Sequence, residues 1–232
     1  MQAKLLRGPL LLLLYQAVPV QAARDSLGRH RIAVGYGMGQ WEHEVFNCNG
    51  EFVRSAKIPY HSAGLEIDEW MTPRFRITGF GGTYRPTVDA DTPDYAGPFG
   101  GAQAAFEGQH FGIGVGFTHL SGSDGGTAPS VYLRGGNLDG VHFRTDFLPP
   151  TATLGSIGMA RIGAGFGDGH LRRTSGFLGI ALGPYSDKAA LTGSIRFFIA
   201  NGLAVQADGI VGPGRQYGQG GAALALRYDF GR

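Results

Sequence analysis

Short segments in which bulky apolar residues alternate with glycine recur along the chain, and they restrict its fold more than any other feature. Residues 31–39 read RIAVGYGMG, residues 111–118 read FGIGVGFT, and residues 161–167 read RIGAGFG. Successive side chains of a β-strand point to opposite faces, so each segment has one bulky apolar face and one face of tiny or polar residues. In a soluble sandwich the tiny face would contact water, where Thr, Lys and Glu are usual. Glycine fits better where other groups crowd that face, as in a narrow barrel lumen filled by Arg side chains.

The segment 189–212 predicts a β-hairpin with a defined register. A three-residue loop at 200–202, with Gly202 in the left-handed conformation, pairs Ile199 with Leu203 and keeps the apolar and polar faces separate. A two-residue loop would mix the two faces. We therefore predict the three-residue loop.

The first 22 residues have the form of a secretory signal peptide. Lys4 and Arg7 precede an apolar run from Pro9 to Val20, and small side chains surround the expected cleavage point after Ala22. The run is shorter than the roughly 20 residues that span a bilayer as a helix. Removing the two basic residues takes the formal charge from +2 to 0, which argues against a nucleic-acid partner.

An exported chain without an apolar helix can still cross a membrane as a closed barrel. No stretch after residue 23 approaches 18 apolar residues, and the alternating segments are the signature of barrel strands. We predict an all-β fold, with residues 23–232 forming one closed antiparallel up-and-down transmembrane β-barrel of about 12 strands. Ten or eight strands are alternatives. Predicted connections are short near 71–73, 108–109, 136–140 and 200–202, and longer at 42–61, 85–98, 121–129 and 212–219.

The C-terminal segment carries a resemblance to a known class. Leu224, Leu226, Tyr228 and Phe230 lie at every second position, with Gly231 and Arg232 after them. This resembles the closing strand of bacterial outer-membrane β-barrel proteins, in which such residues are the assembly signal. The resemblance implies insertion into the outer membrane of a Gram-negative-type bacterium, with both termini periplasmic. It implies two partners, the barrel assembly machinery and outer-membrane lipids.

The charged residues of the strands are expected to point into the lumen, because an outward Arg at mid-bilayer costs about 2–4 kcal/mol. They could form an Arg-rich constriction that selects anionic or polar solutes, or a closed network of Arg–carboxylate pairs that plugs the barrel. The function predicted is thus a non-enzymatic barrel, either structural or a narrow passive conduit for small solutes. The predicted lumen residues are Glu66, Asp68, Arg74, Arg76, Arg134, Arg144, Arg161, Arg196, Asp208, Arg227 and Asp229.

His119 and Ser121 form the best candidate for a catalytic pair. They continue the bulky face of the segment 111–118 to the strand end. The stretch is similar to the His-x-Ser region of outer-membrane lipid A deacylases, which implies His119 as the base for the Ser121 hydroxyl. Gly122 stands where that family has Asn, and no Glu follows about a dozen residues later. Asp124 and Asp139 are the nearby carboxylates.

The remaining candidate features favour no further chemistry. His110 and His142 lack partners at metal-ligand spacing, so no metal site and no cofactor are predicted. Cys48 is either a buried spectator, which we favour, or a free thiol. External loops such as 122–129 could bind outside molecules, with ligands that the sequence does not identify. A soluble lipocalin-like periplasmic carrier is the remaining alternative, in which the bulky faces would point inward.

Overall fold

The computed structural model describes residues 30–86, 97–121, 126–153, 160–167, 174–182, 189–200, 202–212 and 220–230, without the side chains of 41–46, 54–58 and 86. The predicted signal peptide, residues 1–22, lies outside these ranges. Within them, no helix is long and apolar enough to cross a membrane.

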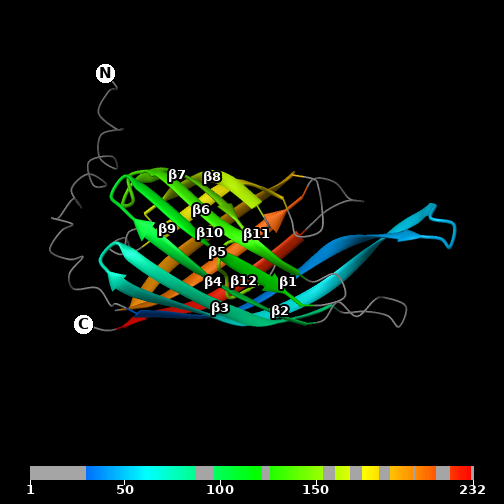
Figure 1. Ribbon diagram of the computed structural model, residues 1–232, viewed down its shortest axis with the longest axis horizontal. Helices are drawn as coiled ribbons and strands as arrows, with labels where there is room; N and C mark the ends of the chain where they lie inside the picture. Colours follow the sequence, from blue (N-terminus) through cyan, green and yellow to red (C-terminus); the bar gives the residue numbers. More distant parts are fainter. Residues whose placement is uncertain are drawn as a thin grey trace, which may run out of the picture.

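The described residues form twelve strands that close into one antiparallel barrel (Figure 1). Each strand pairs with its neighbours along the chain, and β1 closes the barrel by pairing with β12 from His30↔Phe230 to Gln40↔Gly220. The predicted fold class and strand number are confirmed, and the alternatives of ten and eight strands are wrong. The strands are β1 (His30–Phe46), β2 (Phe52–Thr72), β3 (Phe75–Pro86), β4 (Gly97–Glu107), β5 (Phe111–Leu120), β6 (Gly126–Gly136), β7 (Val141–Phe147), β8 (Ala160–Phe166), β9 (Thr174–Leu182), β10 (Ala189–Ala200), β11 (Leu203–Val211) and β12 (Gly220–Phe230).

The barrel has two distinct ends. At the terminal end, β1 begins, β12 ends, and short connections lie at 73–74, 108–110 and 137–140, close to the predicted positions. The opposite end is called the loop end. Here the predicted long loop at 42–61 is wrong, because β1 and β2 stay paired out to Phe46↔Phe52 as a projecting hairpin (Figure 1). Beyond Gln40 and Tyr60 the hairpin has left the barrel, since the pairing with β12 and β3 has ended.

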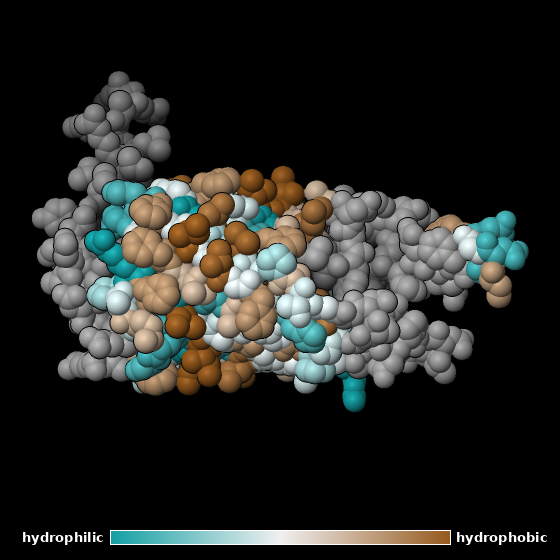
Figure 2. Space-filling model, viewed as in Figure 1, coloured by the Kyte–Doolittle hydropathy of each residue, from teal (hydrophilic) through white to brown (hydrophobic). Residues whose placement is uncertain are grey.

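Large apolar side chains are exposed on the outside of every strand except β4. Val34, Val115, Phe197 and Leu226 are 59%, 58%, 47% and 57% exposed, and Figure 2 shows apolar residues spread over the middle of the barrel. An apolar band around a closed barrel matches the hydrocarbon core of a bilayer. This orientation is the opposite of the one that a lipocalin-like carrier requires.

The β10–β11 hairpin follows the predicted register except beside its turn. Phe197 pairs with Val205, and Gly202 has the left-handed φ of +77°. The register then shifts, so that Ala200 rather than Ile199 pairs with Leu203. The shift adds one residue to one strand, which is the geometry of a β-bulge next to a turn.

The inner face carries two kinds of side chain. Towards the loop end, the buried Tyr60, Phe80, Tyr84 and Phe99 of β2–β4 form an aromatic cluster with Leu120. Towards the terminal end, charged and polar side chains fill the lumen. The barrel interior is therefore an aromatic core towards the loop end and an ionic network towards the terminal end.

Candidate functional site in the charged lumen

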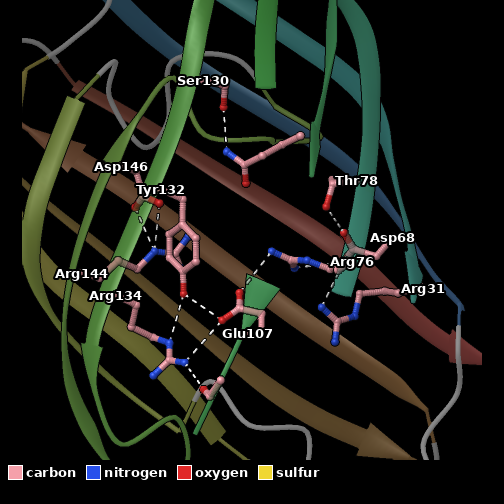
Figure 3. Close-up of polar contacts among 12 residues, drawn as sticks. Arg31, Asp68, Arg76, Thr78, Glu107, Ser130, Tyr132, Arg134, Arg144 and Asp146 are labelled. Atoms are coloured by element: carbon pink, nitrogen blue, oxygen red, sulfur yellow. Dashed lines mark hydrogen bonds and ion pairs between the residues drawn. The ribbon is translucent and has the colours of Figure 1, made fainter. Parts of the chain in front are cut away.

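Asp68 binds two arginines of the ionic network in the lumen (Figure 3). Its side chain is fully buried, and its carboxylate accepts hydrogen bonds from Thr78 Oγ1 at 2.5 Å and Arg31 Nη1 at 3.2 Å. Arg76 Nη1 lies 3.5 Å from the same carboxylate, and Arg31 Nε donates to Asp229 at 2.6 Å. Two guanidinium groups therefore share one buried carboxylate, which links β1, β2 and β3.

Glu107, the last residue of β4, extends the network around the barrel. Its carboxylate lies 3.6 Å from Arg76 Nη2 and 3.5 Å from Arg134 Nη2. The hydroxyl of Tyr132 donates to Glu107 at 3.2 Å and accepts from Arg134 Nε at 3.1 Å (Figure 3). Such shared charge-assisted hydrogen bonds fix each long side chain in one position.

Asp146 of β7 holds a second pair of guanidinium groups. Arg144 Nε and Arg161 Nε donate to its buried carboxylate at 2.9 and 2.6 Å. Each guanidinium also lies over an aromatic ring, Arg144 4.9 Å from the centre of Tyr132 and Arg161 4.7 Å from that of Phe177. Carboxylate and ring together hold the planar cations towards the barrel interior.

The strands β2, β11 and β12 complete the network. Arg227 Nη2 donates to Glu66 Oε1 at 2.8 Å across β1. Gln206 Nε2 donates to both carboxylate oxygens of Asp208, at 2.8 and 2.9 Å. Charged groups therefore surround the lumen on nearly all sides.

These side chains enclose a water-accessible cavity of about 130 Å³, which has room for several water molecules. Among the residues that the structure describes, six arginines line it and three carboxylates do, Glu66, Glu107 and Asp208. Asp68 and Asp146 belong to the network without lining the cavity, because they lie behind the guanidinium groups that they bind. The open space is therefore bordered mainly by cations. The arginines are Arg31, Arg76, Arg144, Arg161, Arg196 and Arg227.

A segment that the sequence did not predict crosses the lumen. Leu148–Thr153, called the strap below, follows β7, which lies six strands from β1 in either direction around the barrel. Ala152 and Thr153 are nonetheless packed against Gly35 of β1. Both are buried, and residues 150–153 line the cavity. The strap therefore spans the interior from one wall to the opposite one.

All but one of the predicted lumen residues lie in strands and are buried or half-buried. The exception is Arg74, which lies exposed in the turn between β2 and β3, where it is no longer bound by strand alternation. Arg31, Glu107 and Asp146 were missed. Arg31 could have been placed in the lumen, because it lies two residues before the inward-facing Ala33 and so shares its face. Asp146 was missed because the expected strand ended at Thr145, one residue earlier.

His119 and Ser121 are brought together on the outer surface at the loop end of β5. His119 Nε2 lies 3.2 Å from Ser121 Oγ, and its Nδ1 lies 2.9 Å from Thr127 Oγ1. The Thr127 hydroxyl therefore orients the His119 ring, in the position that a carboxylate takes in a catalytic triad. Asp139 lies in the turn at the terminal end and is too far along the barrel to take that role, and Asp124 lies outside the described residues.

The remaining candidates take positions that the sequence left open. Cys48 is exposed at the tip of the β1–β2 hairpin, so its interpretation as a buried spectator is wrong. His142 is buried and points inward, whereas His110 is exposed in a turn. No group of three or more His, Cys, Asp or Glu side chains suited to a metal ion occurs in the part of the chain that the structure describes.

No protein-family model and no curated protein matches the sequence. Solved structures do match in fold. An outer membrane channel from Pseudomonas putida F1 superimposes with a TM-score of 0.51 at 13% identity, covering 93% of this chain and 98% of that one. The chain has the outer-membrane β-barrel fold. The translocator domain of the autotransporter NalP from Neisseria meningitidis (TM-score 0.40, 12% identity, 94% and 96% covered) and a mutant Rh. blastica porin (0.36, 10%, 86% and 100%) also match this barrel.

Proposed function

We propose that this protein is an integral outer-membrane barrel that acts as a narrow conduit for small solutes and favours anions. The observation that carries the proposal is the orientation of the ionic network. Six of its arginines border the cavity, while Asp68 and Asp146 lie behind them in the wall. A water-filled space bordered by fixed cations in a low-dielectric wall attracts anions and repels cations.

The size of the cavity supports a narrow pathway over a wide pore. About 130 Å³ accommodates water and small solutes, whereas the open channels of porins need barrels of roughly 16 strands or more. The fold neighbour from Pseudomonas putida is itself described as an outer membrane channel. The apolar outer band supports the membrane location, and the resemblance of the C-terminal strand supports a periplasmic terminal end.

The proposal is tested by electrical recording from the purified barrel in planar lipid bilayers. A tenfold gradient of potassium chloride should give a reversal potential of the sign expected for chloride permeation. Replacing a cavity-lining cation, Arg196→Gln, should move this potential towards zero. Arg74→Gln is the matched control, because Arg74 is exposed in a turn and should leave the potential unchanged.

Cation selectivity of the unmodified barrel would contradict the anion preference. The absence of conductance at every salt concentration would contradict the conduit itself and leave a plugged structural barrel. Equal shifts for the two Arg variants would mean that overall charge, rather than the lumen, sets the selectivity.

A second candidate function is a lipid-modifying hydrolase at the membrane surface, which the contact between His119 and Ser121 favours. In the tautomer with its proton on Nδ1, the His119 ring donates to Thr127 and leaves Nε2 to accept the Ser121 proton. That is the arrangement of a nucleophile with its base, with Thr127 in the orienting position. The site faces outward at the loop end of the barrel, where acyl chains would meet headgroups.

Incubation of the folded barrel with lipid A, followed by mass spectrometry, tests this function. Loss of an acyl chain that depends on Ser121 and is abolished by Ser121→Ala would support it. Lipid A left intact by the unmodified protein would remove it. Ser62→Ala is a suitable control, because Ser62 is buried and faces inward.

A further inference from the structure

The strap is the one element that crosses the lumen, in the part of the chain that the structure describes, and its place relative to the charged cavity is defined. On β1, the cavity is lined by Arg31, while the strap contacts Gly35, further towards the loop end. On β2, the cavity is lined by Glu66, and the strap contacts Gly64, again on the loop-end side. A solute that entered from the loop end would therefore meet the strap before the arginines.

We propose that the strap sets the size limit of the conduit and that Gly35, Gly37 and Gly64 form a slot that holds it in place. This inference rests on the proposed conduit function. It adds a barrier that is separate from the arginines, so that size and charge are selected by different parts of the lumen.

The fit between strap and slot leaves no room for a side chain on the wall. A Cβ atom added at Gly35 would lie 2.7 Å from Thr153 Cγ2 and 3.0 Å from Ala152 Cβ. One added at Gly64 would lie 2.7 Å from the carbonyl oxygen of Ala152. Glycine weakens a β-strand, but it is found inside strands where another segment of backbone approaches closely. The strap supplies this approach.

The other end of the strap is fixed where it leaves the wall. Leu148 has a φ of +45°, which turns the chain inward, and its carbonyl accepts a hydrogen bond from Thr118 Oγ1 at 3.1 Å. Two prolines follow, at positions that need no ladder hydrogen bond. Thr151 Oγ1 then accepts from Thr153 N at 3.1 Å and donates to Thr153 O at 2.8 Å, which makes the tip compact. The strap is thus held by β5 and β7 at its start and packed against β1 and β2 at its far end.

Gly35 is the best position for a test, because the atoms nearest to its added Cβ all belong to the strap. At Gly64, by contrast, the nearest atom is the carbonyl oxygen of Gly81 in the wall. Gly35→Val should push the strap from its slot. Because the substitution itself adds volume to the lumen, an increase in permeation by the folded variant supports displacement of the strap. Gly79→Val is the control, since an added Cβ there meets nothing within 4 Å.

Two readouts are used: bilayer conductance, and swelling of protein-containing liposomes in neutral sugars of increasing size. Gly35→Val should raise conductance at least about twofold and admit larger sugars, while Gly79→Val should behave as the unmodified barrel. A folded Gly35→Val barrel with unchanged conductance and sugar limit would overturn the inference. If only Gly35→Val conducts, the strap is the barrier and the unmodified barrel is not a conduit; if neither conducts, both proposals fail.

A second variant keeps the test valid if Gly35→Val does not fold. Thr151 lines the cavity, so Thr151→Cys in a Cys48→Ser background places a single thiol on the strap. Reaction with a charged methanethiosulfonate should reduce conductance by more than about half if the strap forms the narrowest part. The unmodified barrel is the control, because its exposed Cys48 reacts at the hairpin tip outside the lumen. Equal conductance before and after modification of the strap thiol would overturn the inference.

Discussion

Substitution of Asp68 by Asn should destabilise the barrel markedly. The carboxylate is fully buried and is shared by Arg31 and Arg76. Removing one member of a buried ion pair costs about 3–5 kcal/mol, because the partner charge stays buried. Arg31 keeps Asp229 at 2.6 Å and Arg76 keeps Glu107 at 3.6 Å, so we expect the lower end, about 3 kcal/mol.

The neighbouring residue offers a matched control. Glu69 contacts His30 on the outer surface, where both side chains are about two-fifths exposed. Exposed ion pairs contribute about 0–1 kcal/mol, so Glu69→Gln should have little effect. The double variant Asp68→Asn, Arg76→Gln should be more stable than Asp68→Asn alone by about 1 kcal/mol or more in the free energy of unfolding. The second substitution removes one of the two cations that Asp68 otherwise neutralises.

The measurement is denaturant unfolding of the refolded barrel in detergent micelles, followed by tryptophan fluorescence. Trp70 reports on the site directly, because it lines the cavity and Arg76 lies 5.5 Å from its ring centre. Equal midpoints for Asp68→Asn and Glu69→Gln would refute the reasoning, since the lumen would then screen its charges as well as bulk water does.

Three further predictions concern the wall of the barrel. Val115→Arg should lower the free energy of unfolding in lipid vesicles by about 2–4 kcal/mol, because it places a charge on the apolar band, and an effect near zero would contradict the membrane orientation. Gly202→Ala should lower the free energy of unfolding by about 1–3 kcal/mol in the same assay, because φ is +77° and the new Cβ would lie 2.5 Å from the Asp229 carbonyl oxygen. Phe230→Ala should reduce the heat-modifiable, membrane-inserted fraction in cells while the variant still refolds in detergent, and equal insertion would contradict the assembly role of the last strand.

The alternation of side chains was sufficient to predict the barrel wall. In each strand, large and small residues such as Val115 and Gly116 mark the outer and inner faces. A shift of the pairing register by one residue would turn every side chain to the opposite face. For that reason the register between Phe197 and Val205 could be predicted from parity alone. The alternation rule does not apply beyond the ends of the strands. This explains why Arg74 was wrongly placed in the lumen and why Asp146 was missed.

Two elements carry no such signal. The strap has neither alternation nor a ladder partner, and its Pro149-Pro150 pair indicates only a break in the strand. In the projecting hairpin, Glu42, Glu44 and Lys57 interrupt the apolar pattern, so alternation alone predicts no strand there. Outside the bilayer a strand needs no apolar face, so the rule that identifies barrel strands does not apply to it. The predicted crowding by arginine is likewise wrong for Gly35, which faces the strap.

The cationic border of the cavity follows from the lengths of the charged side chains. The lumen network contains nearly equal numbers of arginines and carboxylates, so its composition alone predicts a neutral interior. An aspartate carboxylate lies one methylene from the backbone and stays at the wall, as Asp68 and Asp146 do, whereas three methylenes carry a guanidinium group towards the barrel axis. Two of the three carboxylates that do line the cavity, Glu66 and Glu107, have the longer acidic side chain. A neutral ring of Arg–Asp pairs in a narrow barrel therefore presents its positive ends to the solute, and exchanging Asp for Glu in such a ring would weaken that preference.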